Sequence, residues 1–543
     1  MKLLHDRSGT RIALAASLGW LLALPLAADT LVTKDGRVIE VKKTSEDSGG
    51  YHLIFEAGEI VVPKDHVASV EIEGDMADYV PKDDKERELL AKGFVRLKGK
   101  WISKPQYESE LAAASAARRA RTAELVRRSD FANGWKVESK HFLFQSNTSA
   151  EILQRYVDLL ESYYALMDTR IGIKPTPTLA RTKMAVNVYR RQKEMIVAAG
   201  GDEQIDESVL GYFDSSGQTL NFFHDYKDPD RSIQTALHEC THLLTYLIDP
   251  DYLSQIWINE ATAEFFGSCE VTIAKGKVTL VPGRVLEDAI LTVQQMLGEK
   301  KQVALSKVLA AEDEEFDGLY YAHAWSFVYF LQNTPKYAKP FNKFFKDLYG
   351  LDLKEEKAEL LDAGSGDRSG LRRRYTKEAI RDTLLKRLGV KDVDALEKEW
   401  LAFVAAVPLP GTHARFLRGY NRTLYEGDAK GGLADLDAAI DAGFKDPEAF
   451  WARGYARLGS GQREKALEDF KRAVELAPLD AVYRADVAWC LTGWWGKDSE
   501  KIHGSEEDIA EAAKQLGLAA ALDPENDELQ TLYDEFVEAR KAK

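Results

Sequence analysis

Two histidines four residues apart offer the clearest chemistry in this sequence, in the segment 235–244 that contains His-Glu-Cys-Thr-His. On a helix, His238 and His242 project from one face and can share a metal ion, whereas Glu239 can reach a water on that metal. Zinc takes nitrogen and carboxylate ligands in a tetrahedron, and catalytic zinc sites leave one position to water. The spacing therefore predicts a zinc site with Glu239 as general base. The alternative is a core helix whose histidines only form hydrogen bonds.

A second predicted helix, residues 257–266, supplies the third ligand that such a site needs. Glu260 and Glu264 lie one turn apart on the same face of this apolar, aromatic segment. Buried carboxylates are costly unless they are paired or bind a metal. We therefore expect Glu260 to be a ligand and Glu264 to accept the far N–H of a ligand histidine, which fixes its tautomer. The alternative is that both carboxylates face solvent. The turn Asp249-Pro250 brings this helix back towards the histidines.

With these residues the sequence resembles the gluzincins, zinc metallopeptidases defined by HExxH and a downstream glutamate. More narrowly, it resembles a secreted branch of peptidase MA-like proteins, which often carry a β module before the peptidase domain and repeats after it. The resemblance covers roughly residues 135–350 and is densest from 211 to 266. It implies a peptide or protein substrate, zinc as cofactor, Glu239 as general base, and His238, His242 and Glu260 as metal ligands.

Two departures from the aminopeptidase branch favour an endopeptidase. Ala261 follows Asn259-Glu260 where that branch has glycine, and its Gly-x-Met-Glu-Asn motif, which grips a free amino terminus, is absent from the sequence. Relatives supply the oxyanion donor from a tyrosine on a later helix, followed by small residues. That pattern implies Tyr321, with His323 as the second candidate.

The elements around the motif mix strands and helices. Residues 185–189 are expected to form a strand, and 211–213 with 219–223 a hairpin through Ser215-Ser216-Gly217. We expect the strand Thr219–Phe223, just before the zinc helix, to be an edge strand that aligns a substrate backbone. Residues 135–361 are thus predicted to be a zincin-like mixed α/β peptidase domain.

The flanking regions complete an α+β multidomain chain. Residues 29–76 alternate apolar and polar positions between turn signals, which predicts a small β module. Residues 77–134 should hold a hairpin near Gly99 and a helix over Tyr107–Arg128, whose composition favours helix. Residues 362–410 are expected to be a linker, centred on the glycine- and serine-rich 363–370, and helices.

The last region, 411–543, is repetitive. The segment Ala449–Pro478 resembles a tetratricopeptide repeat, with Gly454, Ala466 and Phe470 at the family's offsets. Gly427 and Leu436 recur about one 34-residue period later as Gly461 and Phe470, and a looser copy ends at Pro524. Small residues at these offsets let paired helices approach. The resemblance implies α-helical repeats that bind a protein partner.

The amino terminus carries the signs of a secretory signal peptide. Lys2, Arg7 and Arg11 precede an apolar run, 12–28, that ends in small residues. Cleavage after Ala27 or Ala28 would place the mature protein outside the cytoplasm, as a secreted or periplasmic protein. The alternative is a retained membrane anchor. No other stretch of the sequence is long and apolar enough to span a bilayer.

Composition narrows the class of protein further. The chain has 543 residues, with 73 Lys and Arg against 88 Asp and Glu. A net charge of −15 argues against a protein that coats nucleic acid. Three cysteines are too few for a disulfide scaffold, although a Cys240–Cys269 bond is possible. The function expected is zinc-dependent peptide hydrolysis; the rival is an inactive peptidase-like scaffold that acts in assembly through its repeats.

Overall fold

The computed structural model describes most of the chain and packs it into two compact units. The first unit combines residues 1–123 with 410–543, and the second is 124–409. The described residues are 29–33, 38–71, 81–97, 100–173, 182–200, 209–225, 229–274, 277–349, 358–362, 371–409, 411–496, 499, 501–524 and 526–541. The predicted signal peptide, 1–28, and the predicted linker, 363–370, lie outside them. The boundaries expected from the sequence for the smaller regions stay predictions.

The second unit is built on a five-stranded mixed sheet of order β12-β13-β11-β10-β9. The three inner strands run parallel, and both outer strands are antiparallel to their neighbours. Alternating burial along β11 shows why this apolar segment forms a strand with one face on the core. The strand bounds are β9 Trp135–Glu138, β10 Phe142–Ser146, β11 Met184–Tyr189, β12 Gly211–Asp214 and β13 Thr219–Phe223.

This order confirms the predicted strand and hairpin but corrects one expectation. The strand Thr219–Phe223 pairs with β11 on one side and β12 on the other, so it is not an edge strand. The hairpin folds Gly211–Asp214 outwards, so that β12 is an edge strand of this sheet within the described residues, as β9 is at the other end. An alternating pattern identifies a strand but does not say which neighbour covers it.

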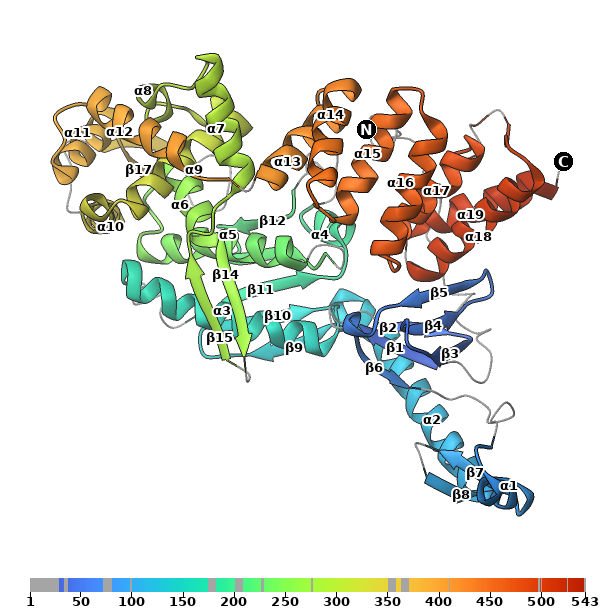
Figure 1. The fold of residues 1–543 in the computed structure, drawn as a ribbon. Helices are drawn as coiled ribbons and strands as arrows, with labels where there is room; N and C mark the ends of the chain where they lie inside the picture. The colour runs from blue at the N-terminus through green and yellow to red at the C-terminus, as the bar shows by residue number, and fades with distance from the viewer. Residues whose placement is uncertain are drawn as a thin grey trace. The chain divides into compact units, whose positions relative to one another are not determined.

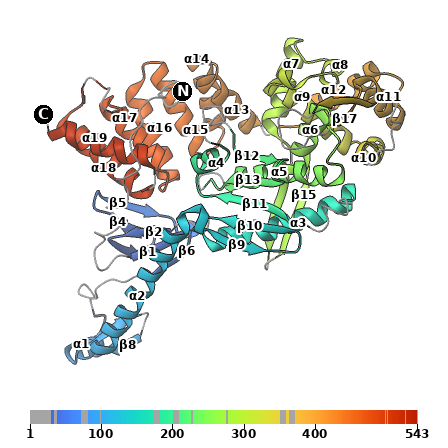
Figure 2. The same cartoon turned by 180° about the vertical axis from the view of Figure 1, so that it is seen from behind.

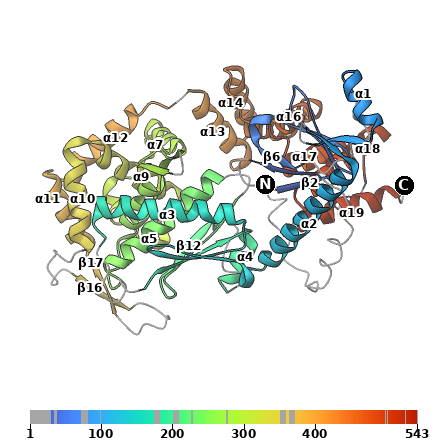
Figure 3. The same cartoon turned by 90° about the horizontal axis from the view of Figure 1, so that it is seen from below.

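Two helices pack on this sheet and against each other. Helix α3 (Ala150–Ile171) begins at a Ser149 cap and ends at Gly172 in the left-handed conformation. Helix α5 (Pro229–Ile248) carries the histidine motif and packs on β12 and β13. Because α3 also contacts α5 and β10, both helices cover the same face of the sheet (Figure 3).

Helix α6 (Ile256–Gly267) follows the turn after Ile248 and packs against α5 and α9 (Gly318–Asn333). It is apolar nearly all round, with Trp257 and Ile258 fully buried, as a helix between two others must be. The hairpin of β14 (Cys269–Ala274) and β15 (Lys277–Pro282) comes directly after it. Figure 1 shows α6 between α5 and α9.

The remaining elements of this unit close the core around α9. Trp400 is fully buried and its Nε1 donates to Ser326 Oγ over 3.2 Å, which ties α12 to α9. Gln294 Nε2 donates to the Val404 carbonyl over 2.9 Å, which ties α7 to the end of α12. The bounds are α4 Gln192–Ala198, α7 Glu287–Glu299, α8 Leu305–Val308, α10 Pro335–Tyr349, β16 Ala358–Asp362, β17 Leu371–Tyr375, α11 Lys377–Leu388 and α12 Val393–Ala406.

The first unit begins with two three-stranded antiparallel sheets, β2-β1-β6 and β3-β4-β5. Gly50 has φ +150°, and a Cβ there would lie 2.3 Å from the Val62 carbonyl oxygen, so this turn needs glycine. The predicted β region is thus confirmed (Figure 2). The strand bounds are β1 Asp29–Thr33, β2 Val38–Val41, β3 Lys43–Glu46, β4 Tyr51–Ile54, β5 Glu59–Val62 and β6 Val67–Glu71.

A hairpin and a long helix follow, as the sequence predicts. Strands β7 (Phe94–Leu97) and β8 (Lys100–Ser103) pair antiparallel after the short helix α1 (Asp84–Ala91). Helix α2 runs over Lys104–Ser129, three residues earlier than expected at its start. No helix among the described residues has the length and hydropathy to cross a membrane.

The carboxy-terminal part of the first unit consists of successive antiparallel helix pairs. Gly454 lies in α15 where this helix packs on α16, and a Cβ there would lie 2.6 Å from the Phe470 ring. The close approach of the two helices explains the glycine. Arg453 Nε donates to Asp469 Oδ2 over 3.0 Å in this pair, and Arg418 to Asp435 over 2.8 Å in the pair before it. The helix bounds are α13 Gly411–Leu424, α14 Ala429–Asp441, α15 Pro447–Gly459, α16 Arg463–Leu476, α17 Ala481–Thr492, α18 Glu506–Leu522 and α19 Asp527–Lys541.

Candidate metal centre

Helix α5 presents His238 and His242 on one face, as their spacing predicts. Their Nε2 atoms lie 3.1 Å apart, and each side chain is about one-seventh exposed, at 14%. The opposite face of the helix holds Leu237, Cys240 and Leu244 fully buried in the core. Packing of that apolar face therefore fixes the direction in which both imidazoles point.

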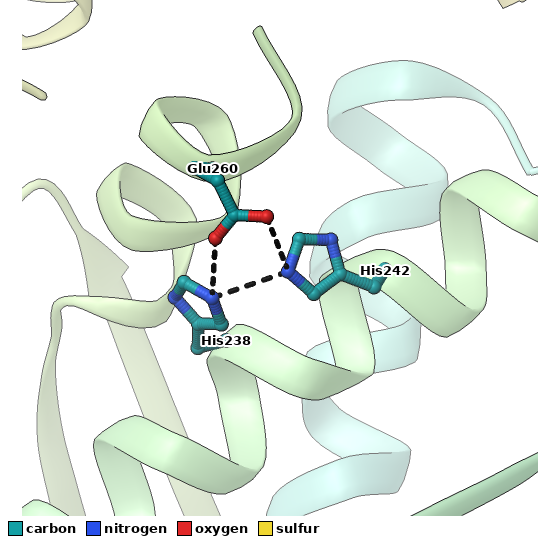
Figure 4. Close-up of side chains that lie close together, drawn as sticks. All are labelled: His238, His242 and Glu260. Atoms are coloured by element: carbon teal, nitrogen blue, oxygen red, sulfur yellow. Dashed lines mark hydrogen bonds and ion pairs between the residues drawn. The ribbon is translucent and has the colours of Figure 1, made fainter. Parts of the chain in front are cut away.

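Glu260 on α6 completes a three-residue cluster (Figure 4). One carboxylate oxygen lies 3.4 Å from His238 Nε2 and the other 3.6 Å from His242 Nε2. A tetrahedral ion about 2.0–2.1 Å from each ligand would hold its ligands about 3.3–3.4 Å apart. The two imidazole nitrogens and the two carboxylate oxygens lie at distances close to these, and this is the group among the described residues that could hold a metal.

The outer nitrogen of each imidazole has its own acceptor. His238 Nδ1 lies 2.8 Å from Glu264 Oε2, as the sequence predicts. His242 Nδ1 lies 3.2 Å from Asn259 Oδ1, while the Asn259 amide nitrogen donates to Glu260 over 3.1 Å. That donation fixes which end of the amide faces His242. Both Nδ1 atoms thus carry a proton, and in a neutral imidazole the Nε2 atom is left to direct its lone pair to the cluster.

Three acceptor groups that converge repel one another unless a cation lies among them. Burial opposes protonation of His238, yet Glu260 and Glu264 raise its pKa well above the ordinary value. Burial likewise disfavours ionised Glu260, but His238 and His242, with the Tyr321 hydroxyl, hold its pKa at about 2. In the metal-free chain a proton on His238 therefore supplies the positive charge that a metal ion would otherwise bring.

Close packing of two helices brings the ligands together. A Cβ on Gly267, the last residue of α6, would lie 3.0 Å from the backbone nitrogen of His238. Only glycine lets the end of α6 approach α5 so closely without displacing it. The approach sets Glu260 and Glu264, one turn apart on α6, opposite the two histidines.

Tyr321 reaches the cluster from α9, where the Asp317 side chain caps the first turn. Its hydroxyl donates to Glu260 Oε2 over 2.6 Å, and 36% of the residue is exposed. Burial, then the charge of Glu260, raises the pKa of the phenol, which therefore stays protonated. The second candidate, His323, is fully buried; Val303 N donates to its Nε2 over 3.1 Å, and its Nδ1 lies 2.7 Å from the Leu319 carbonyl. His323 is thus held in the core.

Glu239 is partly buried on α5 beside the cluster. Its negative charge contributes to the raised pKa values of both His238 and Tyr321, so its carboxylate lies within electrostatic reach of both. The neighbouring Cys240 and the nearby Cys269 are free, buried thiols, so the possible disulfide between them is not formed. Burial raises the pKa of both thiols.

Two residues of the site are not identified by the sequence analysis. Asn259 orients His242, and Gln234 donates to Glu264 Oε1 over 2.6 Å. A signal for Gln234 exists, because it lies one turn before His238 on the same helical face. Asn259 precedes the ligand Glu260 directly, and adjacency in sequence does not indicate a shared site.

The comparisons with known proteins cover part of the chain. Residues 232–347, which include most of α5 and all of α6 and α9, match a family described as "Protein of unknown function (DUF1570)". The chain is also similar to serine/threonine-protein phosphatase T of Trypanosoma brucei brucei (strain 927/4 GUTat10.1), at 29% identity over 176 residues. It covers 28% of this chain and 36% of that protein, so the chain spans little more than a third of this curated relative.

Proposed function

We propose that this protein is a zinc-dependent peptidase that cleaves internal peptide bonds. The observation that carries the proposal is the convergence of His238, His242 and Glu260, at 3.1–3.6 Å from one another, beside Glu239. Two imidazole nitrogens and one carboxylate form a donor set that suits zinc and leaves a fourth position open. A purely structural zinc site has no use for a carboxylate base between its histidines.

Each residue of the site then has a distinct part in hydrolysis. A bound zinc ion would act as a Lewis acid and lower the pKa of a water molecule. Glu239 accepts the proton of the attacking water and later delivers it to the leaving amine. Tyr321, whose phenol stays protonated, turns from Glu260 to donate to the oxyanion. Glu264 and Asn259 hold the imidazoles in the tautomer that ligation needs.

The substrate is a peptide or protein chain in extended form. Within the described residues, strand β12 pairs with another strand on one side only, so its other side is a sheet edge next to α5. A peptide added there as a further strand would lie along the helix that carries the histidines. This role, expected for Thr219–Phe223 from the sequence, thus passes to Gly211–Asp214.

We propose further that the protein acts outside the cytoplasm, as a secreted or periplasmic enzyme, and that its helix pairs bind a protein partner.

The helix pairs of 411–541 favour one rival function, a peptidase-like scaffold without catalysis. Glu239→Gln separates the two, because it removes the base and keeps the metal ligands. A peptidase should lose activity on a peptide library by orders of magnitude and keep about one zinc per chain. Zinc content of His238→Ala and Glu260→Ala checks the ligands: retention of zinc in Glu260→Ala would move the third ligand to Glu264. Equal cleavage, or none, by wild type and Glu239→Gln would exclude the enzyme.

A further inference from the structure

Glu264 accepts a second hydrogen bond besides that from His238. Gln234, one turn before His238 on α5, donates from Nε2 to Glu264 Oε1 over 2.6 Å. Gln234 Oε1 in turn accepts from Arg284 Nη2 over 3.3 Å. Arg284 lies just after β15, far in sequence from the histidine motif. Three hydrogen bonds therefore connect an arginine on another element with the ring of a candidate metal ligand.

The direction of these bonds is set from the arginine end. A guanidinium only donates, so it accepts nothing from the Gln234 amide and must face its oxygen. The amide nitrogen is then left to face Glu264, whose ionised carboxylate only accepts. The reversed amide would set N–H groups against N–H groups at Arg284 and oxygen against oxygen at Glu264. Arg284 therefore selects the orientation in which Gln234 supports Glu264.

Gln234 has an alternative that this arrangement suppresses. The amide and the arginine both border a pocket of about 250 Å³, which Asp230 and Glu270 also line. A polar space of this size admits water, so an unrestrained amide could turn into it.

We infer that Gln234 and Arg284 are positioning residues of the metal centre, acting through Glu264 on His238. This role rests on the proposed metal site, in which Gln234 and Arg284 would keep the His238 ring oriented. Loss of a partner that orients a ligand histidine lowers metal affinity about 10–100-fold. Gln234 contacts Glu264 and not His238 itself, so we expect Gln234→Met to lower zinc affinity by the lower end of that range. Arg284 is one hydrogen bond further from His238, so we expect a smaller loss of affinity in Arg284→Met.

Zinc affinity of the full-length protein tests this directly, by competition with a chromophoric chelator. We expect about tenfold weaker binding for Gln234→Met, a several-fold loss for Arg284→Met, and partial recovery in Arg284→Lys. The double variant should bind no more weakly than Gln234→Met alone, because Arg284 acts through the amide. Arg170→Met, which removes an exposed arginine from the last turn of α3, is the matched control and should bind as wild type does.

Thermal unfolding of the metal-free variants separates a loss of folding from a loss of affinity. Arg284 is partly exposed, so its variants should keep the core intact. Their zinc affinities therefore test the inference even if Gln234→Met does not fold. The inference would be overturned if Arg284→Met lowered zinc affinity by the same factor in the wild type and in Gln234→Met. The arginine would then act without the Gln234 amide. Unchanged affinity in Arg284→Met would overturn it as well. A wild-type protein that binds no zinc would overturn both this inference and the metal site.

Discussion

The phenol of Tyr321 donates to Oε2 of Glu260 over 2.6 Å and so connects α9 to the carboxylate that α6 brings to the histidines. The contact spans 61 residues of sequence and joins two helices that pack along each other. Glu260 also accepts from Asn259, so both of its oxygens are oriented before any ion binds. A carboxylate held in this way loses little freedom on ligation, which favours tight metal binding.

Tyr321→Phe should distinguish an oxyanion donor from a residue that only orients Glu260. If the phenol donates to the oxyanion, kcat should fall about 10²–10³-fold at saturating zinc. If it only holds the carboxylate, zinc affinity should fall and activity should return once zinc saturates the site. Steady-state kinetics over a zinc titration give both quantities. Full activity at every zinc concentration would remove Tyr321 from the mechanism.

Zinc affinity should decrease as the pH falls. In the metal-free protein the pKa of His238 is raised well above its ordinary value, so a proton occupies the ring that zinc needs. Zinc must displace that proton, and affinity therefore rises with pH until the pH passes the pKa of His238, then levels off. Glu260, with a pKa of about 2, stays ionised throughout and adds nothing to this dependence. Calorimetry in buffers of different ionisation enthalpy should detect about one proton released per zinc.

Gly267→Ala should loosen the site without touching a ligand. The added methyl group would lie 3.0 Å from the His238 backbone nitrogen and 3.1 Å from its Cα, both on the rigid axis of α5. Separating the two helices costs about 1–3 kcal/mol, and the same displacement draws Glu260 away from the histidines. Both thermal stability and zinc affinity should therefore fall. Gly298→Ala is the control, because a methyl group in that helix meets nothing within 4 Å.

The centre of the site could be predicted from the sequence because its geometry is local. His238 with His242, and Glu260 with Glu264, are each one helical turn apart, and the helical period alone sets each pair on one face. Asn259 and Arg284 could not be found in this way, since their roles depend on how closely α6 crosses α5 and where β15 returns. The sequence wrongly predicts the sheet edge for Thr219–Phe223, for a related reason. An alternating pattern indicates a strand, whereas the neighbours of that strand follow from the folding of the whole hairpin.

Chemical labelling should find Cys240, Cys269 and Cys490 as free thiols. All three are buried, and burial raises the pKa of each, to about 12 for Cys269 and about 11 for Cys490. Thiolates are the reactive form, so the native protein should alkylate very slowly at neutral pH. After unfolding without reductant, mass spectrometry should find three alkyl groups per chain. A single alkyl group would mean that two of the cysteines are bonded, and a peptide that joined Cys240 to Cys269 would require α5 and β14 to lie differently.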